Sequence, residues 1–292
     1  MKIRKFSGWD VLIYAFCLIF GFCCLFPFYY VLIISLADPI VVLQKPFYVL
    51  PYSVDFSSYK MLFSEGSLVS SALVSVFTTV VGTVLGMLAM VMCGYALSKK
   101  HLPGRRFFMT FALIPMFIGA QTIPYYVLIR SLGMMNTVWV LIVPTLISSY
   151  YLIIIKNFFL SVPASLEESA RIDGANDYLI LFRIIIPTSM PMLISVTLFM
   201  AVAHWNEWWH AMLFITNRKL WPMQMMLRDM LANITNNAST PLGQMMMSSR
   251  QTMSPENVRM AAVMITCLPI LLVYPFVQKH LVKGMMIGAI KE

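Results

Sequence analysis

The chain has 292 residues, of which 60% are hydrophobic, and its mean hydropathy is +0.79. Soluble domains contain about 45–50% apolar residues, so this composition excludes an ordinary soluble protein. The formal net charge of +9 does not require a nucleic-acid partner, because the Lys and Arg residues lie largely at the edges of long apolar runs.

Six apolar stretches meet or approach the length of about 20 residues that a membrane-spanning helix needs. They cover about residues 11–37, 68–98, 107–129, 131–155, 184–210 and 259–278. We therefore expect an all-α membrane protein with six transmembrane helices, in which residues 1–292 form a single transmembrane domain. The first run is longer than the apolar part of a typical signal peptide, about 7–15 residues, so we count it as a span.

The basic residues predict the orientation of these spans. They cluster before the first span, between the second and the third, and after the last: Lys2, Arg4, Lys5, Lys99, Lys100, Arg105, Arg106, Lys279, Lys283 and Lys291. With six spans these segments lie on one side, which the positive-inside rule makes the cytoplasm. Both termini and the loop 156–183 are then cytoplasmic. The loop 216–257 lies outside, although it carries the basic residues Arg218, Lys219, Arg228 and Arg250.

Small residues recur along one side of the second span. Ser75, Thr79, Gly82 and Gly86 are three or four residues apart, which places them on one face of a helix. Such stripes let helices approach closely in membranes. The partner is either another helix of this chain or a second subunit, and packing inside the chain is the simpler alternative.

The loop 156–183 departs from the usual charge pattern of cytoplasmic loops, which carry an excess of Lys and Arg. Its two arginines are outnumbered by the acidic residues Glu167, Glu168, Asp173 and Asp177. A helix that rests on lipid headgroups favours Lys and Arg on its polar face, so this segment is poorly suited to lie on a membrane. We therefore expect it to dock on another protein.

A short helix is predicted in the first half of this loop. Ser165 and Glu168 have the spacing of a capping box, and Pro163 just ahead fits the first turn of a helix. Glu167 and Arg171 are four residues apart, in the favourable order for a helical ion pair.

Gly174 is a natural end for this helix. A second helix is expected to begin near Asn176 or Asp177 and to continue into the fifth span. Ala170, Gly174 and Ala175 leave the turn between the two helices without bulk. The surface of another protein could therefore approach the backbone of this turn closely.

The segment 204–210 concentrates aromatic and polar side chains at the end of the fifth span. At about 100° per residue, its three tryptophans share one arc of a helix. One interpretation is an aromatic belt at the outer membrane interface. The other is a part of the translocation path, where aromatic faces stack on sugar rings and polar groups bind hydroxyls, formed by Trp205, Asn206, Glu207, Trp208 and Trp209. Weaker candidates for the path are Tyr125, Tyr126, Tyr150 and Tyr151, for which packing or a place at the membrane interface is the simpler alternative.

The same segment predicts no metal site. His204, Glu207 and His210 are spread around such a helix, which separates them as ligands. The five cysteines of the chain also lack the spacing of a metal site. The chain has no G-x-x-x-x-G-K-[ST], H-E-x-x-H or G-x-S-x-G motif. Its spans carry hardly any charged groups of the kind that ion-coupled carriers use, so we expect the energy for its function to come from elsewhere.

The motifs of the acidic loop resemble those of a known family. Glu168-Ser169-Ala170, followed by Gly174 and then by Ile184-x-Ile186-Pro187, is similar to the EAA loop of ABC importer permeases. Ser169 and Ile186 stand where alanine and leucine are usual. The triplet 173–175, Asp-Gly-Ala, is the form typical of carbohydrate-uptake permeases. Three further segments resemble that group: 132–137, 205–208 and 284–291. The resemblance is nearest to the branch that serves larger oligosaccharides, some of which contain uronic acids.

The resemblance implies the type I ABC importer permease fold, with a cytoplasmic coupling helix that sits in a cleft of a separate ATPase subunit. Glu168, Ala170, Asp173 and Gly174 match the motif and are expected to couple the chain to the ATPase. Glu167, Arg171 and Ala175 lie in the same segment and complete the candidate coupling site.

The expected function is therefore that of a permease subunit, not an enzyme, which forms the path for a sugar or oligosaccharide. The partners implied are a second homologous permease, expected to form a heterodimer, two ATPase subunits and an extracytoplasmic binding protein. ATP and Mg²⁺ would bind to the ATPase subunits, and no cofactor is expected on this chain. The expected location is the bacterial cytoplasmic membrane. The alternatives are a permease for another polar solute, an ion-coupled carrier or channel, and, last, a membrane-embedded enzyme.

Overall fold

The computed structural model describes residues 8–38, 42, 54–64, 66–119, 121–233 and 255–289. These residues divide into two compact units. Unit 1 comprises the described parts of Met1–Gly66 and Leu227–Leu268, and unit 2 comprises those of Ser67–Met226 and Pro269–Glu292. The single transmembrane domain expected from the sequence stays a prediction.

Unit 1 joins the first helix of the chain to the start of the last one. It contains α1 (Gly8–Leu36), α3 (Ser57–Ser64), the end of α12 (Met223–Asn233) and the first part of α14 (Pro255–Ala289). The carbonyl groups at the end of a helix have no partner within the helix. The buried Asn257 satisfies two of them, since its Nδ2 donates to the carbonyl oxygens of Ile34 at 2.9 Å and Ala37 at 2.7 Å. A side chain of α14 therefore closes the end of α1.

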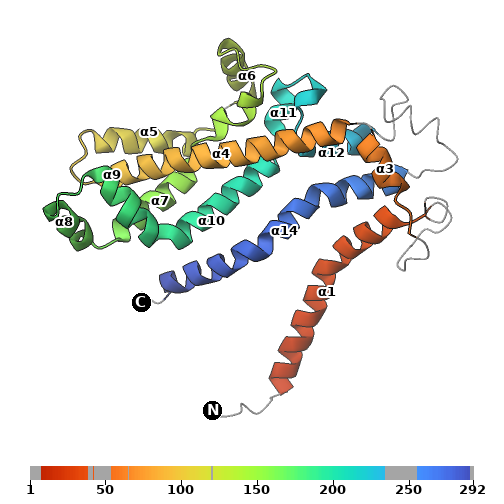
Figure 1. The fold of residues 1–292 in the computed structure, drawn as a ribbon, viewed down its shortest axis with the longest axis horizontal. Helices are drawn as coiled ribbons and strands as arrows, with labels where there is room; N and C mark the ends of the chain where they lie inside the picture. Colours follow the sequence, from red (N-terminus) through yellow and green to blue (C-terminus); the bar gives the residue numbers. More distant parts are fainter. Residues whose placement is uncertain are drawn as a thin grey trace. The chain divides into compact units, whose positions relative to one another are not determined.

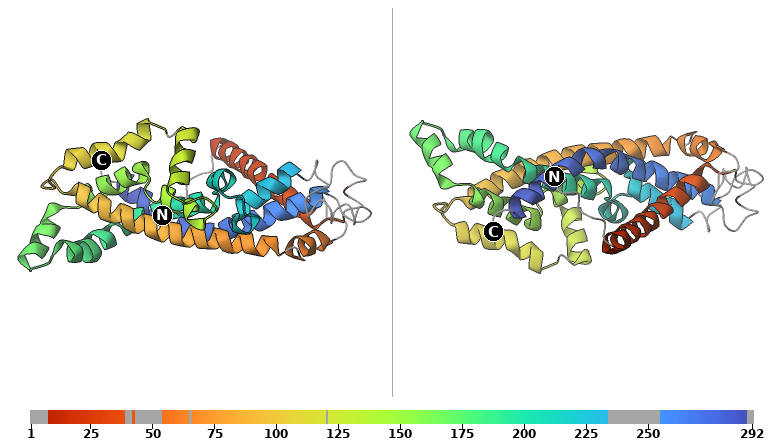
Figure 2. Two further views of the ribbon diagram at one scale, coloured as in Figure 1. Left: turned by 90° about the horizontal axis from the view of Figure 1, so that it is seen from above. Right: turned by 90° about the horizontal axis from the view of Figure 1, so that it is seen from below.

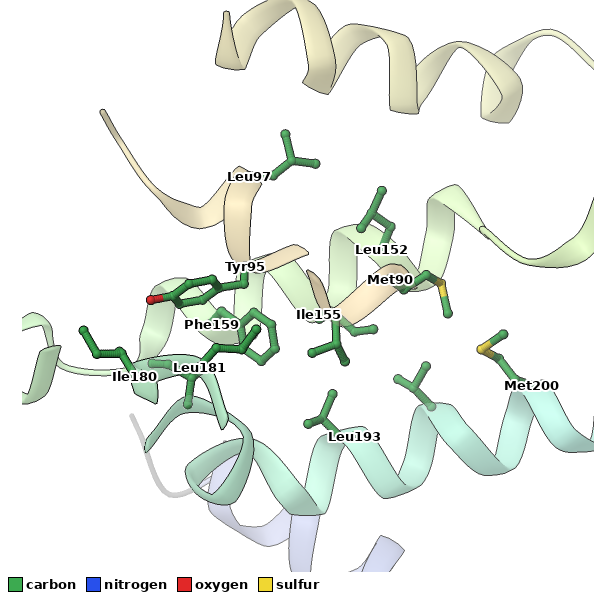
Figure 3. Packing of buried hydrophobic residues seen from close by; sticks show 13 residues of the cluster. Met90, Tyr95, Leu97, Leu152, Ile155, Phe159, Ile180, Leu181, Leu193 and Met200 are labelled. Atoms are coloured by element: carbon green, nitrogen blue, oxygen red, sulfur yellow. The ribbon is translucent and has the colours of Figure 1, made fainter. Parts of the chain in front are cut away.

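Unit 2 is built around α4 (Ser67–Ser98), the second span predicted from the sequence. α7 (Ser149–Ser161) and α10 (Ile186–Trp205) pack along this helix (Figure 1). Tyr95, Phe159 and Leu193 meet between the three helices, and further buried side chains fill the space around them (Figure 3). The ring centroids of Tyr95 and Phe159 are 6.5 Å apart, with the rings edge to face.

The glycine stripe of α4 accounts for this close packing. A Cβ atom at Gly82 would lie 2.6 Å from the ring of His204, and one at Gly86 would lie 2.5 Å from Cε of Met200, both on α10. A Cβ at Gly94 would lie 2.9 Å from the side chain of Ile155 on α7. The prediction that the stripe of small residues serves packing inside the chain is confirmed at Gly82 and Gly86, where any side chain would collide with α10.

Within the described residues, four helices are long and apolar enough to cross a membrane, or five if one bent pair counts as a single span. The four lie at Trp9–Leu36, Ser67–Ser98, Asp177–Phe214 and Glu256–Val273. The bent pair, Val138–Thr145 and Ser149–Ser161, turns by 44° in the segment predicted as the span 131–155. Pro144 lies in a short 3₁₀ turn, Val143–Thr145, and the backbone of Ser148 is extended, which together break the helix.

The segment predicted as the span 107–129 is also not one helix. It forms α5 (Arg105–Phe117) and α6 (Thr122–Ser131). Extended backbone at Ile118 and Gln121 separates the two, and Pro124 follows in the first turn of α6, where its missing N–H is tolerated. Each half is too short to span a membrane alone, since about 20 residues are needed.

Two short helices follow α10. α11 (Trp209–Phe214) and the start of α12 pack on a cluster that includes Ile129, Val140 and Leu141. A 3₁₀ turn, Arg218–Leu220, connects them. Residues 234–254 of the predicted outer loop 216–257 lie outside the described residues.

Candidate functional site

The acidic loop forms a helix and a turn at one end of unit 2. α8 (Ala164–Ile172) and α9 (Asp177–Ile180) lie where α4 ends and α5 begins, in all views (Figures 1 and 2). α8 begins directly after Pro163, whose carbonyl accepts from the N–H of Leu166 at 3.2 Å. The capping box predicted for Ser165 and Glu168 is wrong, because Ser165 already has helical backbone and its oxygen does not cap α8 within the described part of the chain.

The end of α8 at Gly174 is confirmed. The φ angle of Gly174 is +83°, in the left-handed region that favours glycine. The N–H of Gly174 donates to the carbonyl of Arg171 at 3.1 Å, and the N–H of Ala175 donates to that of Ala170 at 2.9 Å. These are the two bonds of a Schellman motif, which satisfies the carbonyl groups at the end of a helix.

The second helix begins where the sequence predicted. Asn176 caps α9, since its Oδ1 accepts from the N–H of Leu179 at 2.8 Å. α9 continues through a π-helical turn, Leu181–Ile185, into α10. Pro187 explains this wider turn, because it has no N–H to donate to the carbonyl of Arg183.

Two ion pairs hold α8, and neither is the one predicted. Glu167 pairs with Lys99, which directly follows α4, and Arg171 pairs with Asp177 at the start of α9. The predicted pair between Glu167 and Arg171 is wrong. Glu167 points toward the end of α4, where its side chain is 21% exposed. Its partner Lys99 is 13% exposed, whereas the side chain of Arg171 is 43% exposed, so the carboxylate pairs with the more buried of the two basic residues.

The residues of the candidate coupling site divide between two sides of α8 and the turn. Ala170 and Ala175 pack against the core of unit 2, so their small side chains serve the fold of this chain. Glu168, Asp173 and Gly174 are exposed. A Cβ atom at Gly174 would have no neighbour within 4 Å among the described residues. Of the three small residues predicted to leave the turn open, Gly174 is therefore the one that does.

Ile172 is an exposed residue of this turn that the sequence reasoning missed. Its side chain is 87% exposed at the last position of α8. The signal was present in the sequence, since an isoleucine between Arg171 and Asp173 interrupts a polar segment without belonging to a span. A bare apolar side chain beside an open turn is suited to enter a hollow on another protein.

The segment 204–210 is not one helix. α10 ends at Trp205, Asn206 follows as its last half-helical residue, and α11 begins at Trp209. The single arc predicted for the three tryptophans is therefore wrong. The carboxylate of Glu207 accounts for the new start, because its Oε1 accepts from the backbone N–H of His210 at 2.9 Å, in the first turn of α11.

The break sends the tryptophans to different surroundings. Trp205 is buried and lines an apolar cavity of about 430 Å³ within unit 2. Trp208 packs on the cluster around Phe214, whereas Trp209 is 42% exposed. The rings of Trp208 and Trp209 meet edge to face with centroids 5.7 Å apart. The three rings thus do not form one stacking surface.

A second cavity, of about 270 Å³, carries polar groups. Its lining comes from the bent pair and from the end of α10 with the break that follows: Thr145, Ile147, Ser148, Tyr151, Met200, Ala203, His204 and Glu207. Of the five residues predicted for the translocation path, only Glu207 lines it. Asn206 instead accepts a hydrogen bond at 2.8 Å from Nε2 of Gln224. Sequence reasoning treated Tyr151 as a weaker candidate and did not name Thr145 or Ser148, which lie one span earlier.

Glu207 also begins a chain of polar contacts. Its Oε2 lies 3.1 Å from Nδ1 of His210, and Nε2 of His210 lies 3.0 Å from the hydroxyl of Tyr125. Tyr125 and Tyr126 pack around Phe214, with ring centroids 5.5 and 5.7 Å away. Groups of three or more His, Cys, Asp or Glu that could hold a metal ion are absent from the residues that the structure describes.

Comparisons with known proteins match nearly the whole chain. Residues 10–287 match the protein family described as "Binding-protein-dependent transport system inner membrane component". A Bacillus subtilis (strain 168) relative, "Polygalacturonan/rhamnogalacturonan transport system permease protein YtcP", is 38% identical over 291 residues and covers 100% of both chains. "Protein LplC" of the same organism is 38% identical over 266 residues, 91% of this chain and 88% of that one. A solved structure, a bacterial ABC transporter "involved in the import of the acidic polysaccharide alginate", has a TM-score of 0.86 at 30% identity and covers 95% of this chain and 99% of that one.

Proposed function

Because the chain belongs to the family of inner-membrane components of binding-protein-dependent transport systems, we propose that it is a permease subunit of an ABC importer for carbohydrates. The substrate is a sugar or oligosaccharide that an extracytoplasmic binding protein delivers. The relatives named for polygalacturonan, rhamnogalacturonan and alginate support an oligosaccharide with uronic acid units. The chain is a transport component, and ATP hydrolysis belongs to two separate ATPase subunits, which bind ATP and Mg²⁺.

The observation that carries this proposal is the open turn after α8. α8 is the coupling helix. At Gly174 a partner protein can reach the backbone, because no described residue of this chain lies within 4 Å of the position of a Cβ atom there. Glu168, Ile172 and Asp173 stand around this turn with exposed side chains. Closure of the ATPase subunits on ATP would move α8, and α9 leads directly into α10.

The ion pair between Lys99 and Glu167 supports a cytoplasmic position for the coupling helix. It joins α8 to the turn between α4 and α5, which contains Lys99 and Lys100 and is followed by Arg105 and Arg106 at the start of α5. Such a basic turn lies on the cytoplasmic side by the positive-inside rule. We propose six spans with both termini in the cytoplasm, in which α5 with α6, and the bent pair ending in α7, each cross the membrane as broken segments.

The polar cavity beside α10 is the proposed part of the translocation path in this chain. Non-helical backbone within a membrane is tolerated where it lines a cavity or is buried in protein. The break in the bent pair and the break after α10 both border this cavity, through Ser148 and Glu207. Thr145, Ser148 and Tyr151 offer hydroxyl groups, and Glu207 offers an acceptor for sugar hydroxyls. A second, homologous permease would complete the path as a heterodimer.

Reconstitution tests the proposal. The chain is co-purified in mild detergent with a second permease and the ATPase subunits, and the complex is placed in liposomes with the binding protein. We expect ATP hydrolysis and uptake of an acidic oligosaccharide that both rise when the binding protein is loaded. Uptake of the sugar by this chain alone, without ATP, would contradict the proposal. Uptake of a non-sugar solute in its place would keep the permease and refute the substrate.

A further inference from the structure

Lys99 connects two parts of unit 2 that are 68 residues apart in the sequence. It directly follows α4, and its Nζ forms the ion pair with Glu167 of α8. The same Nζ lies 4.0 Å from the centroid of the Tyr95 ring, one turn back on α4. A cation held over an aromatic face and paired with a carboxylate has little freedom to move. Lys99 therefore fixes the direction in which Glu167 attaches α8 to α4.

α4 continues from this contact to the polar cavity. Gly82 lies 17 positions before Lys99, roughly 25 Å along the helix axis at 1.5 Å per residue. There α4 touches the ring of His204, which lines the cavity. Farther on, Oγ of the buried Ser75 accepts from the N–H of Met223 at 2.8 Å. A displacement of the end of α4 would therefore reach the cavity through packed side chains.

We propose that Glu167 is a positioning residue that locks the coupling helix to α4 through Lys99, and so gives α8 a second connection to the cavity. The first connection follows the chain, through the ion pair of Arg171 with Asp177 and through α9 into α10. With both connections, α4 and α10 move together when α8 moves. Without the lock, α8 would move α10 but not α4, so only part of the motion of α8 would reach the cavity. This inference rests on the proposed function, and it assigns Glu167 to contacts within this chain and not to the ATPase surface.

The partial burial of the pair makes the lock effective. Side chains that are 13% and 21% exposed are shielded from water and salt far more than a surface pair. Removing one partner leaves the other charge partly buried without its counter-ion, which costs more than losing an exposed pair. The exposed Lys100, the next residue, has the same charge and lies at the same turn. It is therefore a matched control.

The test compares Lys99→Met, Glu167→Gln and the charge exchange Lys99→Glu with Glu167→Lys in the reconstituted complex. The readout is the number of sugar molecules transported per ATP hydrolysed, with recovery of the ATPase subunits as a measure of assembly. We expect each single variant to assemble and to hydrolyse ATP, but to lose transport per ATP roughly fivefold, the factor that about 1 kcal/mol supplies. The charge exchange should restore the ratio, and Lys100→Met should leave it unchanged.

The outcomes separate this inference from the proposed function. If the unaltered complex neither hydrolyses ATP nor transports sugar, the proposed function is wrong. If it does both and the single variants keep its transport per ATP, the lock is refuted. If the single variants fail to assemble, the charge exchange decides alone: recovered assembly and transport support the lock, and their continued loss overturns it.

Discussion

At the scale of single residues, the turn between α8 and α9 is held by local backbone contacts of Gly174 and Asn176. The end of α8 at Gly174 and the start of the next helix near Asn176 or Asp177 follow from what these residues do locally, and both predictions are confirmed. The ion pair of Glu167 was predicted wrongly because its partner, Lys99, is distant in the sequence. Spacing along a helix cannot reveal a residue that only the fold brings close.

The open space at Gly174 leads to a first prediction. Gly174→Asn should preserve the turn, since asparagine tolerates left-handed backbone, but it adds bulk where a partner would dock. We expect normal recovery of the chain and a loss of transport per ATP of about tenfold, equivalent to ~1.4 kcal/mol of docking energy. Gly174→Pro should also break the turn itself, because proline cannot adopt this φ angle and has no N–H for the carbonyl of Arg171.

Gly133 provides the control for that experiment. It ends α6 with a φ angle of +68°, and its N–H donates to the carbonyl of Arg130 at 3.1 Å. A Cβ there would also have no neighbour within 4 Å in the described structure. Gly133→Asn should therefore leave transport per ATP unchanged. An equal loss in both asparagine variants would show that the effect at Gly174 is not specific to docking.

Gly82 leads to a prediction about stability. Gly82→Ala places a methyl group where the ring of His204 now lies, 2.6 Å from its Cε1. Overpacking of this kind costs about 1–3 kcal/mol, so the midpoint of thermal unfolding in detergent should fall. Gly21→Ala in α1 is the comparison, because a Cβ there has no described neighbour within 4 Å and the glycine is within a helix. An unchanged midpoint for Gly82→Ala would contradict the packing of α4 on α10.

At the scale of helices, continuous apolar runs were predicted well and interrupted ones poorly. α4 extends over Ser67–Ser98 and the predicted span over 68–98. By contrast, hydropathy alone could not reveal that 107–129 and 131–155 are broken, because the residues at the breaks are themselves mostly apolar. The same applies to the arc of tryptophans, because α10 ends at Trp205 and the carboxylate of Glu207 starts a new helix after Trp208.

The joint between α1 and α14 leads to a prediction at this scale. Asn257→Asp keeps the size of the side chain but replaces the donor that serves the carbonyls of Ile34 and Ala37. A buried carbonyl without its partner costs about 1–3 kcal/mol, and the new carboxylate would also repel both oxygens. We expect faster amide hydrogen exchange at the end of α1. Glu256→Gln, at the exposed neighbouring position, should leave the exchange unchanged, and identical exchange in both variants would rule out this cap.

At the scale of the whole molecule, motif spacing identified the family that the comparisons show, although the sequence alone located few of the residues around the cavity. Family motifs are local in the sequence, so they can be recognised without knowledge of the fold. A cavity lined by Thr145, Tyr151 and Met200 depends on how separate helices pack. Such neighbours become visible only in three dimensions.

The six-span topology can be tested with two new cysteines. Ser169 on α8 and Ala232 on α12 are both exposed, and one predicted span, 184–210, separates them. In intact cells, a membrane-impermeant maleimide should label Ala232→Cys and reach Ser169→Cys only after permeabilisation. The five natural cysteines lie in apolar runs and should react little with such a reagent, which the unaltered chain checks. Labelling of both new cysteines from the same side would refute the topology.

The π-helical turn Leu181–Ile185 also bears on how the chain tolerates insertions and deletions. A π turn holds about one residue more than an α turn, so it stores a single-residue insertion without disturbing the helix beyond it. Deleting one residue from this turn would remove its extra residue and keep the face of α10 that touches Gly82 and Gly86. The same deletion a turn later would rotate that face by about 100° and separate its contacts. The number of residues between the coupling helix and the cavity can thus change by one at this turn without rotating α10.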